Sequence, residues 1–380
     1  MANTLTNLVP DLYQALDTVS RELVGYIPSV TVDSGVERAA VGQTVRSFVA
    51  PASAAGNITP GVTPPDDGDQ DIGNRNMTIT KARRVPVRWN GEEQRGVQTG
   101  PGYSSILQNQ FAQAMRTLCN EMEADLANLY TLTSRAYGTA GTTPFASDLS
   151  DTAQVRKILV DNGAPVSDMQ LVIDTAAGAK MRTLTQLTKA NEAADASLLR
   201  QGVLLDVHGM SIRESAQIPT TVAGTGTGYL VNDAGGALVI GSTQIPVDIG
   251  TGTIVAGDVI TIAGDPNKYI VAAGVAAPGT ITIAEPGLRV VPADNAAVTI
   301  GAAYTANSAF SRSSIVLATR MPARPEEGDQ ADDVMMVTDP RSGMSFEVAL
   351  YKQYRQVQYE ISAAWGVQNF KPEHSAILLG

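Results

Sequence analysis

The chain has 380 residues, 43% of them hydrophobic and 17% charged, and its formal net charge is −11. This length allows two or three domains with a buried core, and the acidic balance argues against a surface that grips nucleic acid through phosphates, because such a surface needs clustered Lys and Arg. The 35 Gly, 20 Pro and few aromatic residues favour a loop-rich protein with much β structure.

Residues 1–35 are predicted to form an N-terminal arm with a short amphipathic helix that ends at Pro28. The apolar residues of its stripe are Leu8, Leu12, Leu16, Val19 and Leu23. So short a helix is marginal by itself in water, so it must dock on the chain's own body or on a neighbour. The sequence has no signal-peptide pattern and no membrane-spanning segment, which favours folding in a cytoplasm.

Residues 36–100 are predicted to form an extended hairpin with strands at Thr44–Val49 and Met77–Trp89. The Gly- and Pro-rich piece between the strands cannot build its own core. Its acidic residues are Asp66, Asp67, Asp69 and Asp71, and the returning strand carries Lys81, Arg83, Arg84 and Arg88. Because an isolated hairpin is marginal in water, we expect these acids and bases to meet across an intersubunit contact. The alternatives are a solvated loop with scattered charge, or a calcium site that lacks the closing glutamate of an EF-hand.

The segment Ser105–Arg135 is predicted to be one long amphipathic helix. Apolar residues recur every three or four positions, at Leu107, Phe111, Met115, Leu118, Met122, Leu126 and Leu129. Ser105 with Gln108 has the form of a capping box. At 1.5 Å per residue the helix would be roughly 45 Å long, enough to serve as the spine of a domain.

Residues 145–220 alternate predicted helices and strands, as in an α/β or α+β layer. The expected elements are helices at 151–160 and 176–187, a buried strand at 170–174, and a hairpin of 203–207 with 210–213. This hairpin is expected to turn at His208 and Gly209.

Residues 225–305 hold two basic residues and no His, Cys or Trp. Short β runs separated by Gly and Pro turns predict a small barrel or sandwich that packs separately as an inserted domain. The runs are 238–240, 254–255, 259–262, 269–271, 280–283 and 298–300. Farther on, strands are expected at Ser314–Thr319, Ser345–Trp365 and Ala376–Leu379, the second of them against the long helix.

The sequence offers little for catalysis. The two histidines, His208 and His374, are not next to a nucleophile motif, and a zinc site would need more Cys and His than the chain has. Its Gly-rich stretches precede no phosphate-binding Lys and Ser or Thr. We therefore assign no catalytic, cofactor or metal residues and expect no enzyme, with a hydrolase based on a carboxylate pair as a rival.

Three stretches resemble the tailed-bacteriophage major capsid proteins of the Hong Kong 97 type. The first is the arm and charged hairpin directly before the helix at 105–135. The second, 199–219, reads LRQGVLLDVHGMSIRESAQIP. The third is the C-terminal run, with Ala309, Phe310, Ser314–Arg320, Asp339, Ser342, Gly343 and the segment YKQYRQVQYEISAAWGVQNFKPEHSAILLG at 351–380. The segment 225–305 is similar to the additional domain of the Salmonella-phage coat subgroup.

The resemblance implies an α+β fold with an N-terminal arm, an extended hairpin loop, a spine helix with a peripheral sheet, an axial α/β domain and an inserted all-β barrel or sandwich. The implied divisions are the arm, 1–35; the hairpin loop, 36–100; the spine and peripheral domain, 101–144 with 340–365; the axial domain, 145–224 with 306–339 and 366–380; and the inserted domain, 225–305.

The implied function is structural. Copies would form pentamers and hexamers of an icosahedral virion shell, assembled in the host bacterial cytoplasm around double-stranded DNA that they bind without sequence specificity. The implied partners are portal and scaffolding proteins and a decoration protein; no membrane is involved. Rival functions are a tail or decoration protein, or a β-rich carbohydrate-binding protein with exposed aromatic residues.

Overall fold

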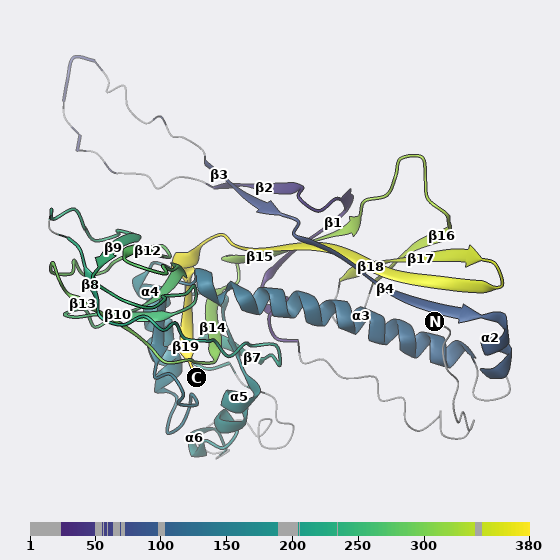
Figure 1. The fold of residues 1–380 in the computed structure, drawn as a ribbon, viewed down its shortest axis with the longest axis horizontal. Helices are drawn as coiled ribbons and strands as arrows, with labels where there is room; N and C mark the ends of the chain where they lie inside the picture. Colours follow the sequence, from purple (N-terminus) through teal and green to yellow (C-terminus); the bar gives the residue numbers. More distant parts are fainter. Residues whose placement is uncertain are drawn as a thin grey trace.

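The computed structural model describes residues 24–49, 55, 57–58, 60–63, 69, 73–97, 103–188, 204, 206–233, 235–338 and 344–380. Figure 1 shows an elongated molecule in which one long helix runs beside a sheet, a barrel lies at one end and a hairpin projects away. Most of the helix predicted to end at Pro28 falls in residues 1–23, outside the described residues, as do Asp66, Asp67 and Asp71; at its predicted end the structure has a 3₁₀ turn, Ile27–Ser29.

The long helix is α3, Tyr103–Ala127, which at 1.5 Å per residue is about 37 Å long. The prediction of a helix from Ser105 to Arg135 was therefore wrong at both ends, and Ser105 is not its cap. A 3₁₀ turn, η3 (Asn128–Leu132), follows α3, and the chain then pairs as strand β5 (Arg135–Gly138). Strand pairing on both sides of β5 overrides the helical periodicity there.

Six strands form the first sheet, in the order β1-β15-β18-β17-β16 with β4 also paired to β18. They are β1 (Thr31–Ala39), β4 (Lys81–Asn90), β15 (Ile315–Pro322), β16 (Ala331–Thr338), β17 (Ser345–Gln353) and β18 (Gln356–Asn369). The single strand predicted over 345–365 is two strands, because the chain turns back at Tyr354 and Arg355, where Arg355 has φ of 55°.

The main core lies between α3 and one face of this sheet. Met115, Leu118 and Met122 of α3 are buried against Trp365 and Ile361 of β18. Burial of apolar surface here contributes about 25 cal/mol per Å². The expected packing of the C-terminal strands on the long helix is confirmed. A further short helix that the sequence reasoning missed, α2 (Gly91–Val97), connects β4 to the chain before α3.

The projecting hairpin consists of β2 (Thr44–Val49) and β3 (Gly73–Thr78). The single returning strand predicted over Met77–Trp89 is split between β3 and β4, because Thr80 donates a backbone hydrogen bond to Trp365 and the chain then joins the six-stranded sheet. Met77 and Ile79 anchor the base of the hairpin on the face of the sheet opposite α3, against Ala364.

The second sheet has eleven strands, and its part β5-β19-β14-β6-β7 forms the axial layer. Besides β5, this part contains β6 (Met169–Ile173), β7 (Met210–Glu214), β14 (Ala306–Ser311) and β19 (Ser375–Leu379), the last preceded by η4 (Pro372–His374). Helix α4, Ser150–Asp161, covers it as predicted. The helix predicted at 176–187 is broken into α5 (Thr175–Met181) and α6 (Thr185–Thr188).

The predicted turn at His208 and Gly209 is confirmed, since both residues have positive φ and Val207 and Met210 exchange backbone hydrogen bonds. The hairpin predicted between 203–207 and 210–213 consists, among the described residues, of the single bridge between Val207 and Met210. Strand β7 pairs instead in parallel with β6.

The other six strands of this sheet close into an antiparallel barrel, because β10 pairs with both β11 and β13. They are β8 (Tyr229–Val231), β9 (Gln244–Asp248), β10 (Val259–Ile262), β11 (Lys268–Ala273), β12 (Gly279–Ile283) and β13 (Ala297–Ile300). The runs at 238–240 and 254–255 are not strands, and β8 and β9 were missed. The barrel has its own core, yet it is also continuous with the axial layer through β11 and β5.

The implied division of the chain stays a prediction, and strand pairing crosses it at several places. It placed 306–339 with the axial layer, whereas β15 and β16 pair in the six-stranded sheet and only β14 pairs in the axial layer. It placed β5 with the spine, whereas β5 pairs in the axial layer, and β18 of the six-stranded sheet extends to Asn369. The N-terminal segment also belongs to the core beneath α3, since Tyr26 and Ile27 are buried in it. Its 3₁₀ turn η2 (Ile27–Ser29) precedes β1, which pairs in parallel with β15.

A first prediction concerns Gly366 of β18, where the hairpin base crosses the sheet. A Cβ atom there would lie 2.2 Å from the backbone oxygen of Thr78, so Gly366→Ala forces the two strands apart. We expect a loss of about 1–3 kcal/mol in the free energy of unfolding, measured by denaturant titration. Gly91→Ala is the control, since its Cβ would meet no atom within 4 Å. Equal stability of the two variants would contradict the close crossing.

Candidate assembly surface

The four basic residues predicted to form one contact lie on opposite faces of β4, because side chains alternate along a strand. Lys81 and Arg83 are directed toward α3. The Lys81 ammonium lies 2.7 Å from Asp125 and 3.4 Å from Glu121, and Arg83 Nε lies 3.0 Å from Glu121. Burial by itself lowers the pKa of Lys81, but the hydrogen bond and the charge of Asp125, followed by those of Glu121, raise it above the ordinary value.

Arg84 and Arg88 alternate onto the outer face, which is the face of the sheet away from α3. Arg84 pairs with Glu360 of β18 at 2.7 Å, while its side chain stays 60% exposed. Arg88 is also exposed, and it has a partner within the chain. Both arginines are therefore accessible to solvent on the outer face, and the Arg84–Glu360 pair is a weak, solvent-screened one.

The rest of the outer face is organised by one buried acid. Glu347 of β17 is 3% exposed and lies 2.6 Å from Arg38 of β1 and 2.8 Å from Arg324, which follows β15. Arg324 also reaches Asp329 at 3.2 Å, and Tyr351 donates a hydrogen bond to the same carboxylate. Arg324 and Glu347 are thus largely buried in this network, whereas Arg84 and Arg88, which also have partners within the chain, are exposed on the outer face.

Among the described residues, Asp69 is the one predicted acid, and it forms no ion pair with these bases. Asp69 is exposed, and the other three acids of the hairpin lie outside the described residues. The proposed meeting of acids and bases is thus untested within the chain. A contact between copies is compatible with the projection of the hairpin away from the sheet (Figure 1).

A buried carboxylate fastens the N-terminal segment to α3. Glu123 is 1% exposed and accepts three backbone hydrogen bonds: from Gly25 at 2.6 Å, Tyr26 at 2.6 Å and Ile27 at 3.0 Å. A Cβ on Gly25 would lie 2.6 Å from the backbone oxygen of Glu214, so only glycine fits there. Tyr26 stacks on Phe310 and donates a hydrogen bond to Ser308 of β14, which ties the segment to the axial layer as well.

The pKa of Glu123 shows that burial of its charged carboxylate is unfavourable. Burial raises its pKa, and the hydrogen bonds from Tyr26, Ile27 and Gly25 and from Ser215 offset only part of that shift. Sequence reasoning missed this residue, although a signal existed. Glu123 is four residues after Cys119 and three before Leu126, which places an acid on the buried side of the helix.

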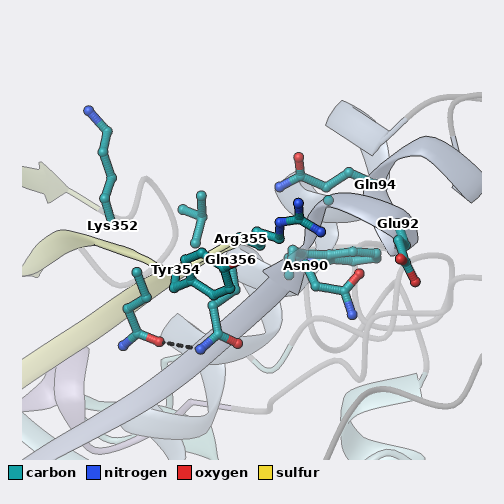
Figure 2. A pocket seen from close by; sticks show the side chains of 11 residues that line it. Asn90, Glu92, Gln94, Lys352, Tyr354, Arg355 and Gln356 are labelled. Carbon is teal, nitrogen blue, oxygen red and sulfur yellow. Dashed lines mark hydrogen bonds between the residues drawn. The ribbon is translucent and has the colours of Figure 1, made fainter.

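A pocket of about 790 Å³ lies at the end of the six-stranded sheet, between the β17–β18 turn and the start of α2. Figure 2 shows Tyr354 and Gln356 on the turn side, and Glu92 and Gln94 on the α2 side, with the hydrogen bond between Gln353 and Gln356 dashed. Tyr354 is 86% exposed beside Arg355, whose guanidinium lies 5.7 Å from its ring. Tyrosine and arginine are typical of protein interfaces.

Both histidines considered in the sequence, His208 and His374, lie in described parts of the chain. His208 Nδ1 lies 2.6 Å from the Thr152 hydroxyl, and burial lowers the pKa of His374. Within the described ranges, no group of three His, Cys, Asp or Glu is placed to hold a metal ion. No helix in those ranges is long and apolar enough to cross a membrane.

Comparison with solved structures identifies a shared fold. The chain is similar to a capsid structure of the cyanophage P-SCSP1u, with 12% identity over 99% of this chain and 92% of that chain, and a TM-score of 0.53. A Mycobacterium phage Che8 structure matches at 12% identity over 99% and 98%, with a TM-score of 0.49. A capsid structure of a native GTA particle matches at 10% identity over 100% and 95%, with a TM-score of 0.48. No family model and no curated protein sequence matches the chain.

A second prediction tests the attachment of the N-terminal segment. In Glu123→Gln an amide NH₂ group replaces one acceptor oxygen, which leaves a buried backbone N–H without a partner. We expect a loss of about 1–3 kcal/mol in unfolding free energy, with faster hydrogen exchange at Gly25, Tyr26 and Ile27. The control is Glu121→Gln, which weakens only part-exposed ion pairs and should cost at most about 1 kcal/mol. Unchanged exchange at the three amides would refute the attachment.

Proposed function

We propose that the chain is the major capsid protein of a tailed bacteriophage, and that its copies form pentamers and hexamers of an icosahedral shell around double-stranded DNA. The observation that carries the proposal is the fold that nearly the whole chain shares with the cyanophage P-SCSP1u capsid structure. The order of elements supports it too: a projecting hairpin, a long helix beside a sheet, an axial layer and a barrel.

In this proposal the protein works by assembly rather than catalysis. Met77 is buried at the base of the hairpin β2–β3, but a two-stranded hairpin is marginal in water by itself, so its projecting part would gain order on the outer face of a neighbouring subunit. Asp66, Asp67, Asp69 and Asp71 would form one side of that contact. Arg84 and Arg88 would form the other, whereas Lys81 and Arg83 would serve the subunit's own α3. Many weak contacts repeated around a closed shell give high collective stability.

The further features of the proposal follow from charge and from the family resemblance. A net charge of −11 lets packaged DNA slide past the shell without adhesion. The protein would reside in the virion after assembly in the host bacterial cytoplasm. Portal and scaffolding proteins would be its partners, and a decoration protein would bind the shell.

The rival carbohydrate-binding function loses support. The tyrosines that such a site would need in the barrel region, Tyr229, Tyr269 and Tyr304, are all at most 2% exposed. A stacking site for sugar rings requires exposed aromatic faces. A tail or decoration role remains the nearest competitor.

The experiment that tests the proposed function is particle formation by the expressed chain. We expect closed shells in negative-stain electron micrographs and a fast-sedimenting species in analytical ultracentrifugation. A chain that remains small and dispersed at high concentration, with and without its phage's scaffolding protein, would contradict the proposal. Rings or tubes of fixed diameter would favour the tail role.

A third prediction concerns Arg88. Arg88→Glu places like charge opposite the acidic hairpin of the neighbour, so we expect shell yield to fall several-fold while the subunit's melting temperature stays within about 2 °C of wild type. Arg213→Glu is the matched control, since Arg213 is an exposed arginine on strand β7 of the other sheet. Equal shell yields from the two variants would reject the role of Arg88.

A further inference from the structure

A second cavity lies where the barrel joins the axial layer. It measures about 420 Å³ and opens between α4, β5 and the turn from β10 to β11. Here β11 pairs with β5, Lys268 opposite Ala136 and Tyr269 opposite Arg135. A ligand in this cavity would therefore contact both the barrel and the axial layer.

Arg135, which lines this cavity, is a buried cation without an anionic partner among the described residues. It is 5% exposed, and its Nη atoms donate to Asn267 and Asn162 at 2.8 Å, both neutral amides. Its Nε atom has no hydrogen-bond partner. A buried charge is costly unless an opposite charge compensates it.

Two lysines add to the positive charge of the cavity. Lys157 of α4 is exposed at its rim, and Lys268 lines it with an ammonium group that donates one hydrogen bond, to the Gly138 carbonyl at 2.5 Å. An ammonium has three donors, so two remain for a ligand. Asp161 is the one acidic residue among those lining the cavity. A locally positive site in a chain of net charge −11 favours an anion.

Nearby acids only partly compensate the charge of Arg135. Asp265 accepts hydrogen bonds from Asn267 and from the Tyr269 hydroxyl, and no ion pair between it and Arg135 is found among the described residues. Burial lowers the pKa of Arg135, and the charge of Arg289 lowers it further, while the charges of Asp161, Tyr269 and Asp265 act in the opposite direction without reversing the shift. Arg289 also lies close to α4, since it donates to the Asp161 carbonyl.

We propose that this cavity binds a phosphate group, held by Lys157 and Lys268 in front of the buried Arg135 charge, and that the bound group fastens the barrel to α4. The ligand is a tetrahedral oxyanion, which is supplied either by free phosphate or by a phosphodiester of nucleic acid. This inference concerns a single subunit and does not depend on shell formation.

Thermal unfolding of the unassembled full chain tests the proposal, with inorganic phosphate titrated against chloride at equal ionic strength. We expect phosphate in the low millimolar range to raise the melting temperature, because binding to the folded state stabilises it by mass action. In the double variant that combines Lys157→Ala and Lys268→Met, the apparent phosphate affinity should fall at least about tenfold. The control Lys180→Ala removes an exposed lysine on α5 and should keep the full response.

The remaining outcomes identify the source of the phosphate or overturn the proposal. A short DNA duplex without terminal phosphates that gives the same lysine-dependent shift identifies the phosphodiester as a source, whereas a shift with inorganic phosphate alone identifies the free ion. An equal phosphate response in the double variant and in wild type, or a response no larger than that to chloride, means an adventitious ion only and overturns the proposal.

Discussion

The rest of the structure depends on the packing of α3 against one face of the six-stranded sheet. That contact buries Met115, Leu118 and Met122, while the opposite face of the sheet carries the hairpin base, with Met77 and Ile79 against Ala364. Two polar attachments fix its position: Trp365 Nε1 donates to Asp125 at 2.8 Å, and Glu123 binds the backbone of Gly25 to Ile27. The helix thereby sets the plane of the sheet, the start of β1 and the direction in which the hairpin projects.

Periodicity in the sequence was sufficient where local pattern and tertiary packing agree. It predicted α4 within one residue at each end and four of the six barrel strands. It failed where strand pairing outweighs local preference. Arg135 was predicted as the last residue of the long helix, yet pairing of β5 with β11 and β19 places it in a strand. The apolar parity of 345–365 changes between Leu350 and Tyr351, which reflects a turn between two strands that no Gly or Pro marks.

The candidate surface was only partly predictable, for similar reasons. Composition showed that Lys81, Arg83, Arg84 and Arg88 are concentrated on one strand, but only the position of α3 decides which face meets Glu121 and Asp125. Pairings such as Glu347 with Arg38 join residues more than 300 positions apart and leave no local signal. Glu123 and Arg135 were missed because charged residues are expected at the surface, and only the packing of the folded chain shows that these two are buried.

Disulfide mapping between copies tests most directly whether the hairpin binds a neighbouring subunit. The native thiol, Cys119, is buried in α3, so introduced cysteines can be followed against little background. Asp69→Cys and Arg88→Cys chains, mixed during assembly and oxidised, should give a disulfide-linked dimer that contains one chain of each kind. Absence of that mixed dimer from assembled and oxidised material would contradict the account.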